Sequence, residues 1–185
     1  MKKILKMLCL ALAVLGGGFG VTSCDEETIS QILGLLSGGT PSTYSGTASL
    51  ECLQGTYNPM NYKKVGEGSA TLQVTVSTNT FSNTATLTIQ GVTVGDVQLG
   101  EITLSNLLYT ANSDNTQCTL SLGESSSILG TFTYNGVSSE GSNAYIGKAT
   151  VNASTAVLEM TLYYGDEMTE AVNLKYSGKV VQTQQ

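Results

Sequence analysis

Few residue types in this chain of 185 residues could perform chemistry. It contains no histidine and no arginine, so it lacks both an imidazole base and a bidentate anion clamp. Carboxylates remain, and Asp96 with Glu101 is the best pair, since two carboxylates at a suitable separation hydrolyse glycosidic bonds. Each flanks a glycine between strand-like runs, where acidic residues are usually solvated. We therefore expect no catalytic residue and no enzyme activity.

A second acidic group could bind calcium. Asp166, Glu167 and Glu170 follow Gly165 closely and offer the oxygen ligands that calcium prefers. Their spacing does not match a recognised calcium loop, so a plain acidic hairpin is the favoured interpretation. We expect neither a metal nor a cofactor.

Two cysteines lie within strand-like runs. Cys52 shares its parity with Leu50, and Cys118 shares its parity with Leu120, so both thiols should point to the apolar side of a sheet. In an oxidising compartment they could form a disulfide, which would contribute about 4 kcal/mol by closing a long loop. Two buried free thiols are the alternative, and the sequence leaves both open.

The segment of residues 54–64 is richer in apolar and aromatic side chains than a plain connection needs. It carries Tyr57, Met60 and Tyr62. At the mouth of a small barrel these side chains would contact a ligand, whereas at a closed end they would complete the core. We expect them to bind a ligand.

The elements that must position these residues are strands. Apolar and polar residues alternate with period two at 70–77, 84–89, 120–122, 132–134, 156–164 and 172–180, and clusters of Gly, Asn, Asp and Ser separate the runs. About eight or nine such runs predict an all-β, antiparallel up-and-down barrel of about eight strands, whose interior is filled by side chains or holds one small ligand. A two-sheet β-sandwich is the alternative.

The N-terminus has the three-part layout of a secretory signal. Positive charges at Lys2, Lys3 and Lys6 precede an apolar run over residues 7–15, and glycines and small residues follow. The run is shorter than the roughly 20 residues of a membrane-spanning helix. Val21-Thr22-Ser23-Cys24 resembles the lipobox of bacterial lipoproteins, which implies a signal peptide over residues 1–23 and a lipid anchor on Cys24.

We interpret residues 24–42 as a lipidated tether. The acidic run at residues 25–27 is either a solvated spacer or a sorting mark, since it resembles the signal that sends Bacteroidetes lipoproteins to the outer face of the outer membrane. Apolar residues at positions 29, 32, 33 and 36 predict a short amphipathic helix. We expect a surface-exposed lipoprotein of the outer membrane, with the periplasmic face as the alternative.

Charge narrows the choice of partners. After residue 23 the chain carries five lysines against fourteen acidic residues, a formal charge of −9. Nucleic-acid binding depends on Lys and Arg, so it is excluded. A ligand should be neutral or cationic.

Three segments resemble the calycin-like domain of Bacteroidetes lipoproteins. They are Tyr44-Ser45-Gly46-Thr47, the stretch from Val94-Gly95-Asp96-Val97 to Gly100-Glu101-Ile102-Thr103-Leu104, and Leu174-Lys175-Tyr176-Ser177-Gly178-Lys179. The resemblance implies a lipocalin-like eight-stranded barrel over residues 43–185. It brings no catalytic residues with it.

Three functions are compatible with these observations. A surface-displayed barrel could bind a small amphipathic ligand or a glycan without catalysis, and a structural or adhesive lipoprotein could act through contacts with an unknown protein partner. A carboxylate-dependent hydrolase ranks third. A roomy interior favours the first function, whereas a filled interior favours the second.

Overall fold

The structure is a computed structural model that describes residues 41–79, 82–113 and 116–181. Within these residues every regular element is a strand, which confirms the predicted all-β class. The expected N-terminal helix lies outside the described residues. The strands are β1 (Ser42–Thr56), β2 (Asn61–Asn79), β3 (Thr84–Ile89), β4 (Val92–Val94), β5 (Val97–Leu99), β6 (Ile102–Ala111), β7 (Gln117–Ser121), β8 (Ser127–Leu129), β9 (Thr131–Tyr134), β10 (Val137–Asn152), β11 (Thr155–Tyr164) and β12 (Glu170–Val180).

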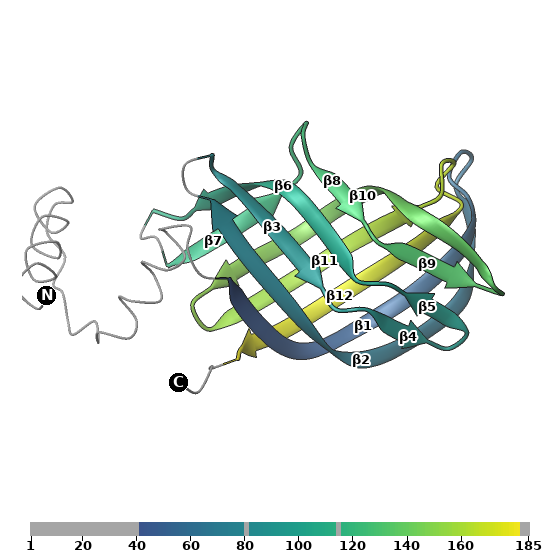
Figure 1. Ribbon diagram of the computed structural model, residues 1–185, viewed down its shortest axis with the longest axis horizontal. Coiled ribbons are helices and arrows are strands. Elements are labelled where there is room, and N and C mark those ends of the chain that lie inside the picture. Colours follow the sequence, from purple (N-terminus) through teal and green to yellow (C-terminus); the bar gives the residue numbers. More distant parts are fainter. Residues whose placement is uncertain (1–40, 80–81, 114–115, 182–185) are drawn as a thin grey trace, which may run out of the picture.

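Antiparallel ladders join eight of these strands into a partial ring (Figure 1). The pairings lead from β1 through β2, β3, β6, β7, β10, β11 and β12, and β12 pairs with β1. The ladder between β7 and β10 is short, from Thr150↔Thr119 to Asn152↔Gln117. Strands β4, β5 and β9 form a second ladder with the first residues of β10, and β8 pairs with β6.

Alternation along the strands separates an inner face from an outer face. Every second residue from Ala156 to Tyr164 is buried in β11, and the same holds from Leu72 to Thr78 in β2. The inward side chains form one continuous cluster, in which Tyr44 is among the largest. Burial of apolar surface contributes about 25 cal/mol per Å², so this cluster is the main stabilising feature of the fold.

Three glycines divide longer strand-like runs. Gly91 lies between β3 and β4, Gly100 between β5 and β6, and Gly130 between β8 and β9. These glycines lie near one another across the sheet. A Cβ on Gly91 would lie 3.1 Å from the carbonyl carbon of Gly100. The amide of Gly100 donates a 2.9 Å hydrogen bond to the carbonyl of Thr131, the residue after Gly130. Glycines at such places allow a sheet to bend. The described residues therefore form twelve strands, whereas the sequence predicts eight or nine. Counting each divided run as one strand gives nine.

The described chain enters and leaves the ring at one end (Figure 1). β1 begins there and β12 ends there, and the amide of Val181 donates a 2.8 Å hydrogen bond to the carbonyl of Thr43. β1 reaches the opposite end at Thr56, about 50 Å away for fifteen extended residues. The turns between β1 and β2 and between β11 and β12 lie side by side at that far end, where Gly55 donates a 2.8 Å hydrogen bond to Thr169.

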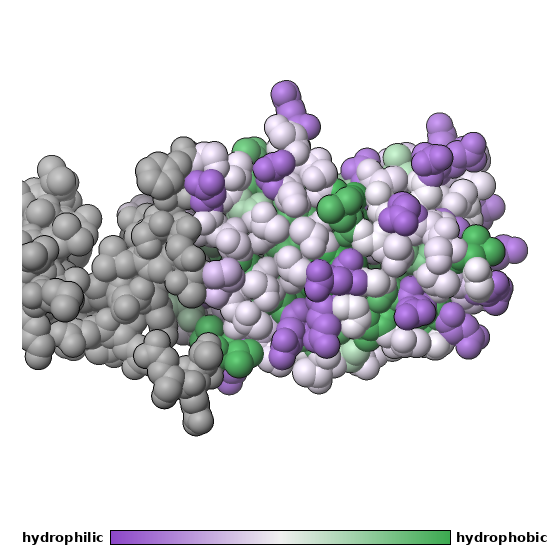
Figure 2. All heavy atoms as spheres, in the orientation of Figure 1, coloured by the Kyte–Doolittle hydropathy of each residue, from purple (hydrophilic) through white to green (hydrophobic). Residues whose placement is uncertain are grey.

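The outer surface is mixed in character. On the face shown in Figure 2, isolated apolar side chains lie among polar and weakly polar ones. Exposed large apolar residues include Leu108, Leu129 and Val137. In the part of the chain that the structure describes, no helix is long and apolar enough to cross a membrane.

Candidate functional site

The three residues predicted to bind a ligand lie at the far end of the ring. The ladder between β1 and β2 continues to the pair Thr56↔Asn61, so most of segment 54–64 is strand and only residues 57–60 form the turn. This differs from the open connection expected from the sequence, because backbone pairing extends to the tip. The turn between β11 and β12 completes the site. We name the following five residues the end cluster: Tyr57, Met60, Tyr62, Tyr163 and Met168.

Two aromatic rings of the end cluster pack edge to face. The rings of Tyr57 and Tyr163 have centroids 5.4 Å apart and planes at 83°. This is a favoured geometry for an aromatic pair, worth about 0.5–1.5 kcal/mol beyond burial. Tyr57 keeps 40% of its surface exposed, and Met60 at the tip of the turn keeps 69%. The cluster therefore presents aromatic and apolar surface to solvent at the end of two paired strands.

Tyr62 has a different role in the cluster. Its half-buried ring brings the hydroxyl to the carbonyl of Met168, to which it donates a 2.5 Å hydrogen bond. Burial is the main cause of the raised pKa of Tyr62. Met168 has a φ of 53°, in the left-handed region that residues other than Gly, Asn and Asp rarely adopt. Tyr62 thus fixes the neighbouring turn, and such backbone outliers are concentrated at functional sites.

The acidic group considered for calcium is divided by the structure. Glu170 is buried, and its carboxylate accepts a 2.7 Å hydrogen bond from Thr169 and a 3.5 Å one from Gln54. Asp166 and Glu167 are exposed in the turn. Among the described residues, no three acidic, cysteine or histidine side chains form a group that could hold a metal ion. The buried carboxylate is engaged in supporting the end of β12.

The structure does not bring together the carboxylates of Asp96 and Glu101. Asp96 is exposed in the turn before β5, and Glu101 is exposed beyond the other end of that strand. Five extended residues span about 17 Å. Glycoside hydrolysis needs carboxyl groups about 5–9.5 Å apart. The pair therefore lacks the geometry of a hydrolytic site.

Cys52 and Cys118 face the interior, as their parity predicts, and both are free thiols. Burial is the main cause of the raised pKa of Tyr44, and the nearby thiol of Cys118 adds to it. Tyr44 and Cys52 are eight residues apart on β1, about 26 Å in an extended strand. A disulfide requires Cα atoms within about 7 Å. The bridge left open by the sequence is therefore not formed, because the two thiols lie toward opposite ends of the interior.

We expect alkali to destabilise the domain by ionising buried thiols and phenols. Burial raises the pKa of Cys52 and of Cys118 from 9.0 to about 11, and the pKa of Tyr44 and of Tyr176 from 10.0 to about 12. A raised pKa stabilises the fold fully below the unfolded value, and this contribution is lost as pH rises through the folded value. The free energy of unfolding should therefore fall from about pH 9 upward, which denaturant titrations at successive pH values measure.

The double variant Cys52→Ala and Cys118→Ala is the control for this pH dependence. Each group that is ionised only in the unfolded chain lowers the unfolding free energy by about 1.4 kcal/mol per pH unit. In the double variant the fall should begin only near pH 10, where the tyrosines ionise. An unfolding free energy of the wild type that stays constant from pH 9 to pH 11 would contradict the burial of both thiols.

Two members of the end cluster were not found from the sequence. Tyr163 lies on the polar side of the alternation in β11, and Met168 lies in the predicted acidic hairpin, so each looks like an ordinary surface residue. No local signal says that the β1–β2 and β11–β12 turns meet, because that contact joins segments about a hundred residues apart.

No protein-family model, curated protein or solved structure matches the chain.

Proposed function

We propose that the protein is a membrane-anchored, non-catalytic binding module of the cell surface, whose end cluster takes a small amphipathic ligand or a glycan. The observation that carries this proposal is the exposure of Tyr57 and Met60 beside Tyr163, on two turns tied together by hydrogen bonds. Buried side chains occupy the interior as one cluster. The exposure of Tyr57 and Met60 places the proposed ligand on the outside of the domain.

The proposal includes a calycin-like, lipocalin-like up-and-down barrel over residues 43–185. The ladders lead from β1 around to β12 and back to β1, which favours a barrel over a two-sheet sandwich. Segments Tyr44-Ser45-Gly46-Thr47 and Ser177-Gly178-Lys179-Val180 pair residue by residue. Two of the segments that resemble the family are therefore neighbours in space, which supports the relationship.

The proposed anchor is a lipid on Cys24, in the outer membrane and facing the outside of the cell, with the periplasmic face as the alternative. Cys24 precedes the end of the ring where β1 begins, and the end cluster lies about 50 Å further along that strand. This placement would hold Tyr57 and Met60 away from the membrane. The charge of −9 after residue 23 favours a neutral or cationic ligand over nucleic acid.

A structural or adhesive lipoprotein is the second candidate function. It is favoured by the continuous cluster of buried side chains inside the ring, since such a protein needs no interior binding site. The exposed rings of the end cluster could then contact a protein partner. A hydrolase has no comparable support, because Asp96 and Glu101 lie beyond opposite ends of β5.

Removal of the exposed part of the end cluster should weaken binding without unfolding the domain. We expect the double variant Tyr57→Ala and Met60→Ala to bind the neutral amphipathic dye N-phenylnaphthylamine about tenfold more weakly, a change of about 1.4 kcal/mol. Met60 is 69% exposed and Tyr57 40% exposed, so the melting temperature should fall by no more than a few degrees. Fluorescence titration measures the affinity, and circular dichroism measures the melting temperature.

Leu129→Ala is the matched control, because Leu129 is 66% exposed on β8, outside the end cluster. Its dye affinity should equal that of the wild type. The proposal fails if the wild type does not bind the dye, or if the end-cluster variant binds it with unchanged affinity. A large loss of melting temperature in that variant would assign the rings to the core instead.

A further inference from the structure

The outer face of the ring carries two hollows that meet. One has a volume of about 410 Å³ and the other about 340 Å³, and both are lined by Glu51, Asn173 and Lys175. Their volumes fall within the range of small-molecule sites, about 300–1,000 Å³. They extend over the adjacent strands β2, β1, β12, β11 and β10. We name the following residues the outer groove: Glu51, Glu67, Tyr145, Thr161, Asn173 and Lys175.

Strand register aligns most of the groove in a single row. Glu67 is paired with Glu51, Glu51 with Asn173, Asn173 with Thr161, and Thr161 with Tyr145. Neighbouring strands lie about 4.8 Å apart, so a row across five strands is about 19 Å long. The row offers side chains at regular intervals to an extended ligand.

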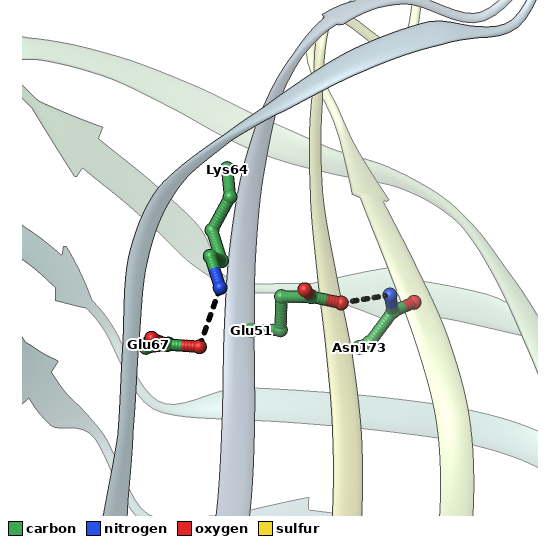
Figure 3. A network of polar contacts seen from close by, with 4 residues as sticks. All are labelled: Glu51, Lys64, Glu67 and Asn173. Atoms are coloured by element: carbon green, nitrogen blue, oxygen red, sulfur yellow. Dashed lines mark hydrogen bonds and ion pairs between the residues drawn. The ribbon is translucent and has the colours of Figure 1, made fainter.

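Hydrogen bonds hold the centre of the row in one orientation. The hydroxyl of Thr161 donates to Oδ1 of Asn173 at 2.8 Å, and Nδ2 of Asn173 donates to Oε2 of Glu51 at 3.1 Å. Figure 3 shows Glu51 and Asn173 reaching toward each other from adjacent strands. A flipped amide would turn its oxygen toward the Glu51 carboxylate, which can only accept, so the bond to Glu51 holds the amide in this orientation. One amide hydrogen of Asn173 and the second oxygen of Glu51 therefore face a ligand in fixed positions.

Charges in and around the groove are nearly balanced. Lys64 forms a 2.6 Å ion pair with Glu67 beside the row (Figure 3). Lys175 is exposed, forms no salt bridge within the described residues, and is paired in register with Glu159. Such a surface has little attraction for a strongly charged ligand. Its fixed donors and acceptors instead suit a neutral ligand that carries many hydroxyl groups.

An exposed aromatic ring lies at one end of the row. Tyr145 is 63% exposed, and its ring passes close to Gly147, where an added Cβ would lie 3.7 Å from the ring. Because glycine has no side chain, the surface beside the ring stays open. An exposed aromatic face next to polar groups can stack on the apolar face of a sugar ring while its hydroxyls bond to neighbouring side chains.

We propose that the outer groove binds an uncharged oligosaccharide. One sugar ring stacks on Tyr145, and the hydroxyls of the following rings exchange hydrogen bonds with Asn173, Glu51 and Lys175. This site is separate from the end cluster and does not depend on the function proposed for it. The two sites use different residues and are tested with different probes, so failure of one leaves the other standing.

The test uses the mature chain, residues 24–185, on an array of cellohexaose, xylohexaose, mannohexaose and the anionic hexagalacturonate. At least one neutral oligosaccharide should bind, and hexagalacturonate should not. In calorimetry with the bound oligosaccharide, the double variant Tyr145→Ala and Lys175→Ala should raise the Kd at least tenfold. Both side chains are exposed, so the variant should melt like the wild type.

Lys179→Ala is the matched control, since Lys179 lies four residues beyond Lys175 on the same exposed face of β12, outside the groove. It should leave the Kd unchanged. The proposal is overturned if no neutral oligosaccharide binds, if hexagalacturonate binds more tightly than all of them, or if the groove variant keeps the wild-type Kd. An equal loss of affinity with Lys179→Ala would also overturn it, because it would indicate nonspecific attraction.

Discussion

Gly46→Ala should destabilise the domain by about 3 kcal/mol or more, which corresponds to a melting temperature about 10 °C lower. Gly46 is paired with Gly178, and the two strands approach closely there. A Cβ on Gly46 would lie 2.1 Å from the carbonyl oxygen of Ser177. That oxygen belongs to the backbone of β12, so relief requires movement of a strand rather than of a side chain. Differential scanning calorimetry measures the change.

A side chain on Gly178, the partner of Gly46 on β12, would also disturb the packing at this point. A Cβ on Gly178 would lie 1.9 Å from the hydroxyl of Tyr176, whose ring is buried above it. Gly147→Ala is the matched control for Gly46→Ala, since its Cβ would meet only ordinary contacts of 3.5 Å and more. It should melt within about 2 °C of the wild type. Equal melting temperatures for Gly46→Ala and Gly147→Ala would refute the close approach of β1 and β12.

Cys24→Ala should abolish the lipidation of the protein. The resemblance to the lipobox implies that cleavage and lipidation both depend on this thiol. Each buried methylene of an acyl chain contributes about 0.8 kcal/mol, and more than one chain makes anchoring stable. The variant should therefore carry no fatty acid, which mass spectrometry of the purified protein measures. It should appear either as the uncleaved precursor or as a water-soluble product.

Cys118→Ala is the control for the lipid anchor, because Cys118 is a buried free thiol of the folded domain. This variant should retain its acyl chains. Fatty acid found only at another residue of the wild type, or none at all, would end the lipoprotein interpretation. So would a Cys24→Ala protein that still carries acyl chains.

Much of the fold follows from period-two alternation. The pattern at residues 156–164 predicts which side chains of β11 are buried, because successive residues of a strand point to opposite faces. The same argument places Cys52 and Cys118 inside. Alternation does not say where a strand bends, so the breaks at Gly91 and Gly100 appear only when neighbouring strands are in place.

The candidate sites are less accessible to sequence reasoning. Tyr57 and Met60 could be recognised because apolar residues were unusually frequent in one short segment. The contact of Tyr57 with Tyr163 depends on the meeting of two distant turns. The row from Glu67 to Tyr145 depends on the register of five strands, and parity alone cannot specify register. In the sequence alone, each residue of the row looks like an ordinary solvent-facing residue of a strand, because its neighbours on the adjacent strands are not known.

The central claim is that ligand recognition takes place on the outside of a packed β-domain. Chemical-shift mapping of the isotopically labelled mature chain during titration with N-phenylnaphthylamine tests it most directly. The account predicts that the largest amide shifts occur at Tyr57, Met60 and Tyr163. Inward residues such as Leu72 and Leu158, which are almost fully buried, should shift little. Largest shifts at these inward residues would contradict the account, because they would show that the ligand enters the interior.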